Sequence, residues 1–328
     1  MLIFLFISGM YMQEFNVITG RFAPSPSGRM HLGNIFTAVL SWLSVRSRGG
    51  KWVLRIEDLD PLRSKRHYSD LIEEDLTWLG LDWDEGGQEG KGSNGPYCQS
   101  RRGGFYEKAL EHLAALDLIY PCYCTRSELI ATNAPHLSDG RRVYGGMCRP
   151  VRFGGRFTDK PDNRQPRAIR LYVPAEKTVA FSDGVFGDIE VNLGCEVGDF
   201  VVRRGDGAWA YQLAVVVDDA MMSVTEVMRG CDLLQSAAQQ IYIYGLLGRR
   251  PPRYVHLPLL CNTRGQRLSK RDGSLSMEAL RKDYSVEDIL GRIGYISGLL
   301  AEPCRATLRQ LLEVYDERKI PCVRQIIV

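Results

Sequence analysis

The chain has 328 residues, of which 45% are hydrophobic and 25% charged, and its formal net charge is only +3. This is the balance of a globular protein, long enough for one large domain with an insertion or for two domains. A broadly basic surface is excluded, so any contact with nucleic acid must be local. The nine cysteines are odd in number and show no repeated spacing, which argues against a secreted disulfide framework and favours a reducing cytoplasm.

The N-terminus is apolar but does not resemble a targeting signal. MLIFLFISGM lacks a positively charged start and is too short to span a bilayer. We expect residues 1–14 to be a disordered extension or the product of a start assigned too early, with Met10 or Met12 as the true start. No other segment approaches the ~20 apolar residues of a membrane helix, so no membrane association is expected.

The next elements alternate between strands and helices. Residues 15–22 predict a strand, and Leu32, Ile35, Phe36, Val39 and Leu40 begin the apolar stripe of a helix closed by two glycines. Residues 51–56 predict a second strand and residues 69–79 a second helix. This order predicts an α/β fold with a Rossmann-type, doubly wound parallel sheet.

The character of the chain changes after a further predicted helix at 104–116. Residues 122–167 are rich in Arg, Gly, Pro and Cys with little periodicity, and residues 169–191 predict antiparallel strands. After Gly273 helices return, and Ser285 with Asp288 predicts a capping box. The predicted organisation is an extension (1–14), a first half of the α/β domain (15–120), an insertion (121–199), a second half (200–275) and a short helical region (276–328).

The segment GRFAPSPSGRMHLGN, residues 20–34, leads from the first strand into the first helix. Pro24 and Pro26 restrict the loop, and Gly28 allows the backbone to approach a ligand. Because a helix N-terminus offers unpaired N–H groups, the segment has the form of a phosphate site in which His31 donates to an oxygen. Alone, it fits equally well a rigid strand–helix turn with a serine N-cap.

A second segment, RLSKRDG at residues 267–273, makes the pattern specific. Together the two resemble the paired signatures of class I aminoacyl-tRNA synthetases: HLGN resembles the HIGH element and RLSKR the KMSKS element. LRIEDLDP, YQLAVVVDD and MRGCDLL follow in the expected order. The resemblance is to the glutamyl branch, most closely to the glutamyl-Q tRNA(Asp) synthetases. Asn34 and Arg267 depart from the two signatures but keep hydrogen-bonding capacity.

The resemblance implies activation of an amino acid. A carboxylate attacks the α-phosphorus of ATP and pyrophosphate leaves; the nucleophile is already ionised, so the protein only aligns the reactants and stabilises charge. His31 and Lys270 are the implied catalytic residues, and Mg²⁺ is expected with the ATP. The implied ATP-binding residues are Gly28, His31, Gly33, Asn34, Ser269 and Lys270.

The amino acid implied by the resemblance is L-glutamate. Its two carboxylates and one ammonium require two cationic donors and one anion, and arginine forks suit carboxylates. The resemblance assigns this role to Arg21, Ala23, Ser25, Glu57, Tyr211 and Arg229. Taken singly, Glu57 or Arg229 could be half of a structural ion pair and Tyr211 a core aromatic. Which arginine takes which carboxylate stays open.

The cysteine-rich insertion carries a candidate metal site. Cys122, Cys124, Tyr144 and Cys148 offer three soft ligands and a phenolate, enough for one tetrahedral site. Tyrosine is an unusual zinc ligand, and buried free cysteines are the alternative. The CxC…YxxxC form resembles the zinc motif of the family, which implies one structural Zn²⁺ per chain; His136 is a competing ligand.

Two features favour the glutamyl-Q branch. Residues 274–328 allow a stem-contact region but not the anticodon-binding domain of a full glutamyl-tRNA synthetase, and Val215 stands where that enzyme usually has Asn. The expected enzyme is a cytoplasmic monomer that transfers activated glutamate to queuosine in the anticodon stem-loop of tRNA(Asp). The alternatives are a truncated glutamyl-tRNA synthetase charging a 3′ end and a non-catalytic RNA-binding module on a synthetase fold.

Overall fold

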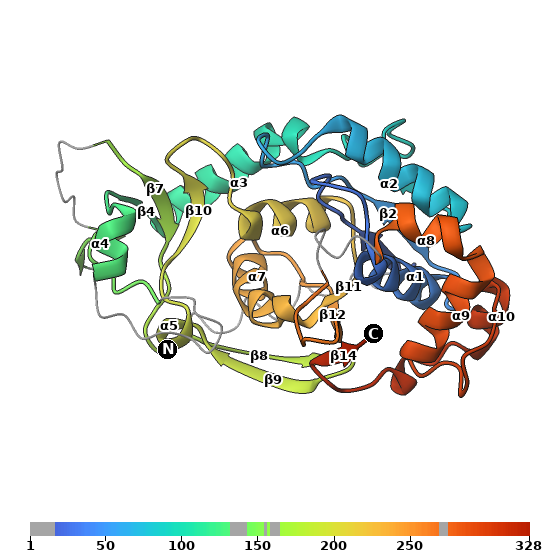
Figure 1. Ribbon diagram of the computed structural model, residues 1–328. Helices are drawn as coiled ribbons and strands as arrows, with labels where there is room; N and C mark the ends of the chain where they lie inside the picture. Colours follow the sequence, from blue (N-terminus) through green and yellow to red (C-terminus); the bar gives the residue numbers. More distant parts are fainter. Residues whose placement is uncertain (1–16, 132–142, 154–155, 158–164, 269–274) are drawn as a thin grey trace.

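A seven-stranded sheet forms the centre of the computed structural model, which describes residues 17–131, 143–153, 156–157, 165–268 and 275–328 (Figure 1). The strand order is β3-β2-β1-β11-β12-β8-β9, and all neighbouring strands pair in parallel except β8 and β9. The strands are β1 (Thr19–Phe22), β2 (Lys51–Leu54), β3 (Glu85–Gly86), β8 (Thr178–Asp183), β9 (Gly187–Asn192), β11 (Glu226–Gly230) and β12 (Arg253–Leu257). The α/β fold with a parallel-dominated sheet, predicted from the sequence, is confirmed.

Helices cover both faces of this sheet because its strands are apolar on both sides. Trp52 and Leu54 pack into the core around α1 (Leu32–Arg46), whereas Val53, between them, packs with residues of α7 (Leu234–Leu246). Next to α7 lies α6 (Tyr211–Met221), which also packs against α3 (Gly103–Ala115). Helix α2 (Arg66–Trp78) contributes Ile72 and Leu76 to the α1 core. Two further short helices are α4 (Arg126–Ala131) and α5 (Leu193–Glu196).

The cysteine-rich part of the chain lies at one end of the molecule, with α4, and carries its own small sheet (Figure 1). This sheet is antiparallel and consists of β4 (Ile119–Cys122), β7 (Ala168–Leu171) and β10 (Phe200–Arg204). Two further strands, β5 (Arg152–Phe153) and β6 (Arg156–Phe157), form a separate pair. Strands β8 and β9 are antiparallel to each other, as predicted, but β8 also joins the main sheet through β12, which the sequence did not indicate.

The C-terminal helices lie at the opposite end of the molecule (Figure 1). They are α8 (Met277–Asp283), α9 (Val286–Ile296) and α10 (Leu308–Val314), and α9 and α10 pack on α1. The predicted capping box is confirmed: the Ser285 side chain accepts from the Asp288 backbone and the Asp288 side chain from the Ser285 backbone. The last strand, β14 (Gln325–Ile327), pairs in parallel with β13 (Leu259–Cys261), a pairing that the sequence analysis did not predict.

The strand and helix ends differ from the predictions by a few residues. Strand β1 begins at Thr19, β2 ends at Leu54, and α2 begins at Arg66, three residues earlier than expected. The expectation for residues 1–14 lies outside the described residues. No helix of the described chain has the length and apolar character needed to cross a bilayer.

Candidate active site

Two neighbouring strands at the centre of the main sheet place the candidate site. Strand β1 leads through α1 to β2 on one side, whereas β11 leads through α7 to β12 on the other. In a doubly wound sheet a crevice opens at such a switch point, beyond the carboxyl ends of the strands, and this is where ligands bind.

A cleft of about 430 Å³ lies at this point. It contains side chains from both strands and from the loop after β1, and α6 contributes to its wall. The predicted site residues that line it are Arg21, Ala23, Ser25, Gly28, His31, Asn34, Glu57, Tyr211 and Arg229. The structure thus brings together all the residues predicted for glutamate and three of the six predicted for ATP, namely Gly28, His31 and Asn34. Ser269 and Lys270 lie outside the described residues.

His31 is the N-cap of α1. The ring nitrogen Nδ1 of His31 accepts a hydrogen bond from the backbone N–H of Gly33 (3.1 Å). The backbone N–H of His31 donates to Asn34 Oδ1 (3.1 Å). An imidazole that accepts at Nδ1 carries its proton on Nε2 when neutral, so the second nitrogen is a donor. The ring lies over Gly33, where a Cβ would stand 3.1 Å from His31 Cε1. Gly33 does not line the cleft but makes room for His31; Gly28, at φ 153°, adopts a backbone that favours glycine.

Arg21 comes from β1 and is only 5% exposed. Its Nη1 donates to the Met228 carbonyl at 3.5 Å, and its Nε lies 3.7 Å from Asp219 Oδ1. Within the described chain Nε has no hydrogen-bond partner. A buried guanidinium with unused donors at a cleft is costly unless an anion binds there, because burying an unsatisfied polar group is unfavourable.

Glu57 provides the negative charge of the cleft. Its Oε1 accepts from Arg55 Nη2 at 3.1 Å, and Arg55, which is fully buried, also donates to Asp219 Oδ1 at 2.6 Å. Burial raises the pKa of the Glu57 carboxyl, although the charges of Arg55 and Arg21 act in the opposite direction. The carboxylate is therefore held in place by the protein and lacks full charge compensation.

Tyr211 and Arg229 complete the amino-acid end of the cleft. Burial raises the pKa of the Tyr211 hydroxyl, and the charge of Glu57 acts in the same direction, so the hydroxyl stays protonated and can donate. Arg229 is 4% exposed, and its guanidinium lies 5.1 Å from the centre of the Tyr254 ring. With Arg21 it places two buried cations beside one buried carboxylate.

Several residues that line the cleft were not assigned to the site from the sequence, although Arg267 was named within the RLSKR segment. Arg267 reaches the cleft and forms an ion pair with Asp232, which follows β11. Arg29 also lines the cleft and pairs with the buried Asp75 at 2.8 Å. Asp232 belongs to the segment MRGCDLL, and Arg29 lies in the loop before HLGN. Their ion-pair partners, Arg267 and Asp75, lie far away in the sequence, so the sequence did not indicate these pairs.

The four predicted metal ligands converge in the cysteine-rich part. The sulfur atoms of Cys122, Cys124 and Cys148 lie within 4.8 Å of one another. The Tyr144 hydroxyl oxygen is 3.7 Å from the sulfurs of Cys122 and Cys124. Cys124 and Cys148 are 3.4 Å apart, which is too far for a disulfide bond. Three thiols around one point, with a phenol beside them, can hold a metal ion such as zinc; His136 lies outside the described residues.

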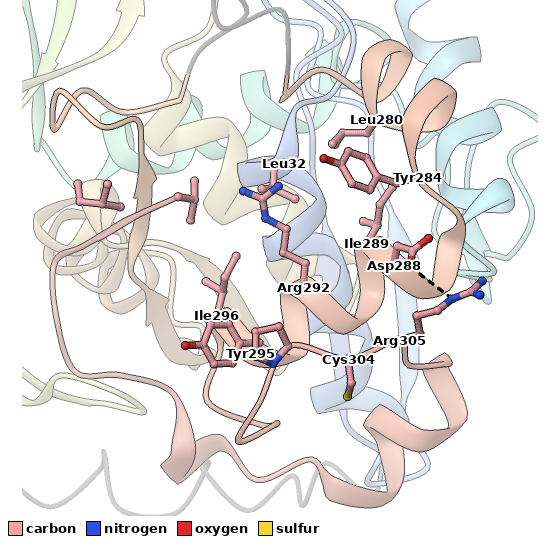
Figure 2. A pocket seen from close by; sticks show the side chains of 13 residues that line it. Leu32, Leu280, Tyr284, Asp288, Ile289, Arg292, Tyr295, Ile296, Cys304 and Arg305 are labelled. Carbon is pink, nitrogen blue, oxygen red and sulfur yellow. Dashed lines mark ion pairs between the residues drawn. The ribbon is translucent and has the colours of Figure 1, made fainter.

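A second, largely apolar cleft lies in the C-terminal region (Figure 2). It has a volume of about 580 Å³ and is lined by residues of α8 and α9, with Arg292 pointing into it and Arg305 paired to Asp288 at 3.3 Å. Of the predicted site residues that the structure describes, none lines this cleft. Its size alone therefore does not make it the candidate active site.

Comparison with known proteins agrees with this geometry. Residues 17–296 match the family model "tRNA synthetases class I (E and Q), catalytic domain". The chain is 46% identical to a glutamyl-Q tRNA(Asp) synthetase of Symbiobacterium thermophilum, over 93% of this chain and 94% of the relative. It is 42% identical to glutamate–tRNA ligase 2 of Alkalilimnicola ehrlichii, over 84% of this chain and 58% of the relative.

Among solved structures, a glutamate-tRNA synthetase of Elizabethkingia anophelis superposes with a TM-score of 0.79 at 26% identity, covering 94% of this chain and 68% of that one. The matched family region contains both strands of the switch point and every described residue of the cleft. The chain therefore belongs to the family of class I tRNA synthetases for glutamate and glutamine, which are ligases.

Proposed function

We propose that this protein activates L-glutamate with ATP and transfers it to queuosine at the wobble position of tRNA(Asp). The observation that carries the first half is the meeting of two buried guanidiniums, Arg21 and Arg229, with the buried carboxylate of Glu57 in one cleft. This charge pattern complements a molecule with two carboxylates and one ammonium.

The ATP phosphates are proposed to lie at the N-terminus of α1. The partial positive charge of this helix end favours an anion, and the Nε2–H of His31 donates beside it. The α-carboxylate of glutamate then attacks the α-phosphorus and pyrophosphate departs. Lys270 and Mg²⁺, which accompanies ATP, are assigned to charge stabilisation on the phosphates; Gly28, Gly33, Asn34 and Ser269 are assigned to the same nucleotide site.

A structural zinc ion is proposed for Cys122, Cys124, Tyr144 and Cys148. The mutual approach of three sulfurs, without a disulfide, supports a soft divalent metal. Four protein donors leave no open coordination position, so the ion would hold the segments around Cys122 and Cys124 and around Tyr144 and Cys148 together and take no part in activation.

The queuosine acceptor is supported by the relatives and by Val215. Identity is higher to the relative named for glutamyl-Q than to the glutamate–tRNA ligase. Val215 is buried on α6, one turn after Tyr211 on the same helix face, so an apolar side chain stands behind the cleft where an amide is usual in the ligases. We further propose a cytoplasmic monomer with the domain organisation given above.

Pyrophosphate exchange tests the activation step. The protein, supplied with ATP, Mg²⁺ and labelled pyrophosphate but no tRNA, should form labelled ATP only when L-glutamate is present. Glutamine and aspartate are the matched controls, since one lacks the second charge and the other a methylene. No exchange with glutamate would reduce the protein to a non-catalytic RNA-binding module.

The acceptor is tested with short RNAs. An anticodon stem-loop of tRNA(Asp) that carries queuosine should accept labelled glutamate, whereas the same stem-loop with guanosine should not. A full tRNA(Glu) with and without its terminal adenosine tests the alternative. Labelling of tRNA(Glu) that requires the terminal adenosine would make the protein a glutamyl-tRNA synthetase instead.

A further inference from the structure

Arg229 is held by three acceptors that are not substrate. Its Nε donates to His256 Nε2 (3.1 Å), its Nη1 to Gln240 Oε1 (2.8 Å) and its Nη2 to the Leu233 carbonyl (3.3 Å). A guanidinium has five N–H groups. Within the described part of the chain, these contacts leave one N–H on each terminal nitrogen that can donate to a carboxylate.

The contact with His256 fixes the protonation of that ring. His256 is fully buried on β12, and its Nε2 can accept from Arg229 only if it carries a lone pair. The proton must then be on Nδ1, which lies 2.6 Å from Asp183 Oδ2. A doubly protonated ring would turn a donor towards the Arg229 Nε–H. Burial and the charge of Arg229 lower the pKa of His256, which keeps the ring neutral although Asp183 and the Leu233 backbone act in the opposite direction.

Asp183 is itself immobilised at the end of β8. Its Oδ1 accepts from the backbone N–H groups of Val185 (3.1 Å) and Phe186 (3.0 Å), and its Oδ2 accepts from the His256 backbone N–H (3.1 Å). These bonds and the His256 ring lower the pKa of the Asp183 carboxyl, so it remains an acceptor. One chain of hydrogen bonds thus crosses three adjacent strands, from β8 through β12 to β11.

We propose that Asp183 and His256 are positioning residues that hold the Arg229 guanidinium in the orientation needed to bind a carboxylate of the amino-acid substrate. Within the described chain neither residue lines the cleft, so both act through Arg229. The inference rests on the proposed glutamate activation. It predicts that the affinity for glutamate depends on a hydrogen-bond acceptor at the position of His256 Nε2, and not on the size of the ring.

Two substitutions of His256 by amide residues distinguish the role of its Nδ1 from that of its Nε2. His256→Asn keeps a donor near Nδ1 for Asp183 but removes the acceptor for Arg229, whereas His256→Gln keeps an acceptor near Nε2. We expect His256→Asn to raise the KM for glutamate in pyrophosphate exchange by about tenfold or more, because a hydrogen bond to a charged group is lost. His256→Gln should raise it less, and the KM for ATP should stay within about twofold in both. His112→Asn, on the exposed surface of α3, is the matched control.

Asp183→Asn tests the hydrogen-bond chain at Asp183, the residue farthest from the cleft. The two backbone N–H groups orient the amide oxygen of the new side chain, so its NH₂ faces His256 Nδ1 and drives the proton to Nε2, opposite the Arg229 Nε–H. The KM for glutamate should rise as in His256→Asn. Nitrogen NMR of ¹⁵N-histidine-labelled protein should show the His256 proton on Nδ1 in the wild type and on Nε2 in this variant.

Equal effects of His256→Asn and His256→Gln on the glutamate KM, or parallel rises in the ATP and glutamate KM values, would overturn the positioning role. A wild-type His256 protonated at Nε2 would overturn it even if a variant failed to fold. A wild-type protein without glutamate-dependent exchange would instead contradict the proposed function, while the NMR result would still report the hydrogen-bond chain.

Discussion

The cleft at the switch point and the cysteine cluster at the end of the molecule both gather polar groups, but they are held in different ways. Around the cleft, Arg55 is fully buried and contacts Asp219 and Glu57. Asp218, also buried, pairs with Arg102 at 2.5 Å. The cysteine cluster has only a small core, made of Tyr120, Cys122, Cys124 and Tyr144.

The difference indicates what holds the polar side chains of each region in place. The cleft is fixed by strands and by ion pairs of the protein itself, and it is lined by the buried guanidiniums of Arg21 and Arg229. In the cysteine cluster three sulfur atoms lie within 4.8 Å of one another and could hold a metal ion. The first region is held by the protein's own charges, whereas the second, with the proposed zinc, would depend on that ion for its order.

The largest effect is expected from breaking the ion pairs behind the cleft. Arg55→Met removes the cation that Asp219 and Glu57 share and leaves Arg21 as the remaining cation beside both buried carboxylates. The free energy of unfolding should fall by about 3–5 kcal/mol, measured by denaturant titration. Arg318→Met, which removes an exposed pair with Asp316, should change it little. Equal stability of the two variants would show that the cleft does not depend on this network.

The next effect concerns Arg21 and Arg229, the two arginines proposed to bind glutamate. Arg21→Ala or Arg229→Ala should each weaken glutamate binding by about 2–5 kcal/mol, because a substrate carboxylate is left unpaired in a buried site. Calorimetric titration of each variant with glutamate measures the loss, and the affinity for ATP is the internal control. Wild-type affinity in both variants would place the amino-acid pocket elsewhere.

Lys270→Ala should lower glutamate-dependent pyrophosphate exchange on the order of 10²-fold, since a cation placed on the triphosphate is lost. Lys282→Ala, on α8 and paired with Glu278, is the matched control. The glutamate affinity of Lys270→Ala should stay at the wild-type value. An unchanged exchange rate would contradict the role assigned to the RLSKR segment.

A smaller effect follows from the buried carboxyl of Glu57. Its raised pKa in the free protein must fall when an ammonium binds, so glutamate affinity is full above this pKa and declines as the pH falls through it, by about tenfold per pH unit. The measurement is a series of binding titrations at decreasing pH, compared between the wild type and Glu57→Gln, because the substrate carboxylates titrate equally in both. Glu57→Gln should remove the dependence; an unchanged slope in that variant would assign it to another group.

The smallest effect on activation is expected at the cysteine cluster. Protein purified without added metal should contain about one zinc per chain, and Cys124→Ser should lose it. Glutamate-dependent exchange should persist, because the cluster and the cleft belong to different cores. Elemental analysis gives the metal content. A wild-type protein that is folded and metal-free would leave the thiols as ordinary buried cysteines.

Much of this protein could be predicted from local sequence. The parallel α/β order, the helix that begins after His31 and the capping box at Ser285 depend on periodicity and on contacts within one helical turn. The residues assigned to glutamate were found because their motifs occur in the order of a known family, and the structure brings them to one cleft.

Only the tertiary structure decided how those residues are held. Asp183 lies 73 positions from His256, and the two meet because β8 enters the main sheet beside β12. Arg55 reaches Asp219 across 164 positions, and β14 returns to pair with β13. Strand order and burial determine such contacts, and neither leaves a periodic signal in the chain. The sequence therefore specified the elements and the chemical groups, while the packing of distant strands determined which charges are shared and which remain available to a ligand.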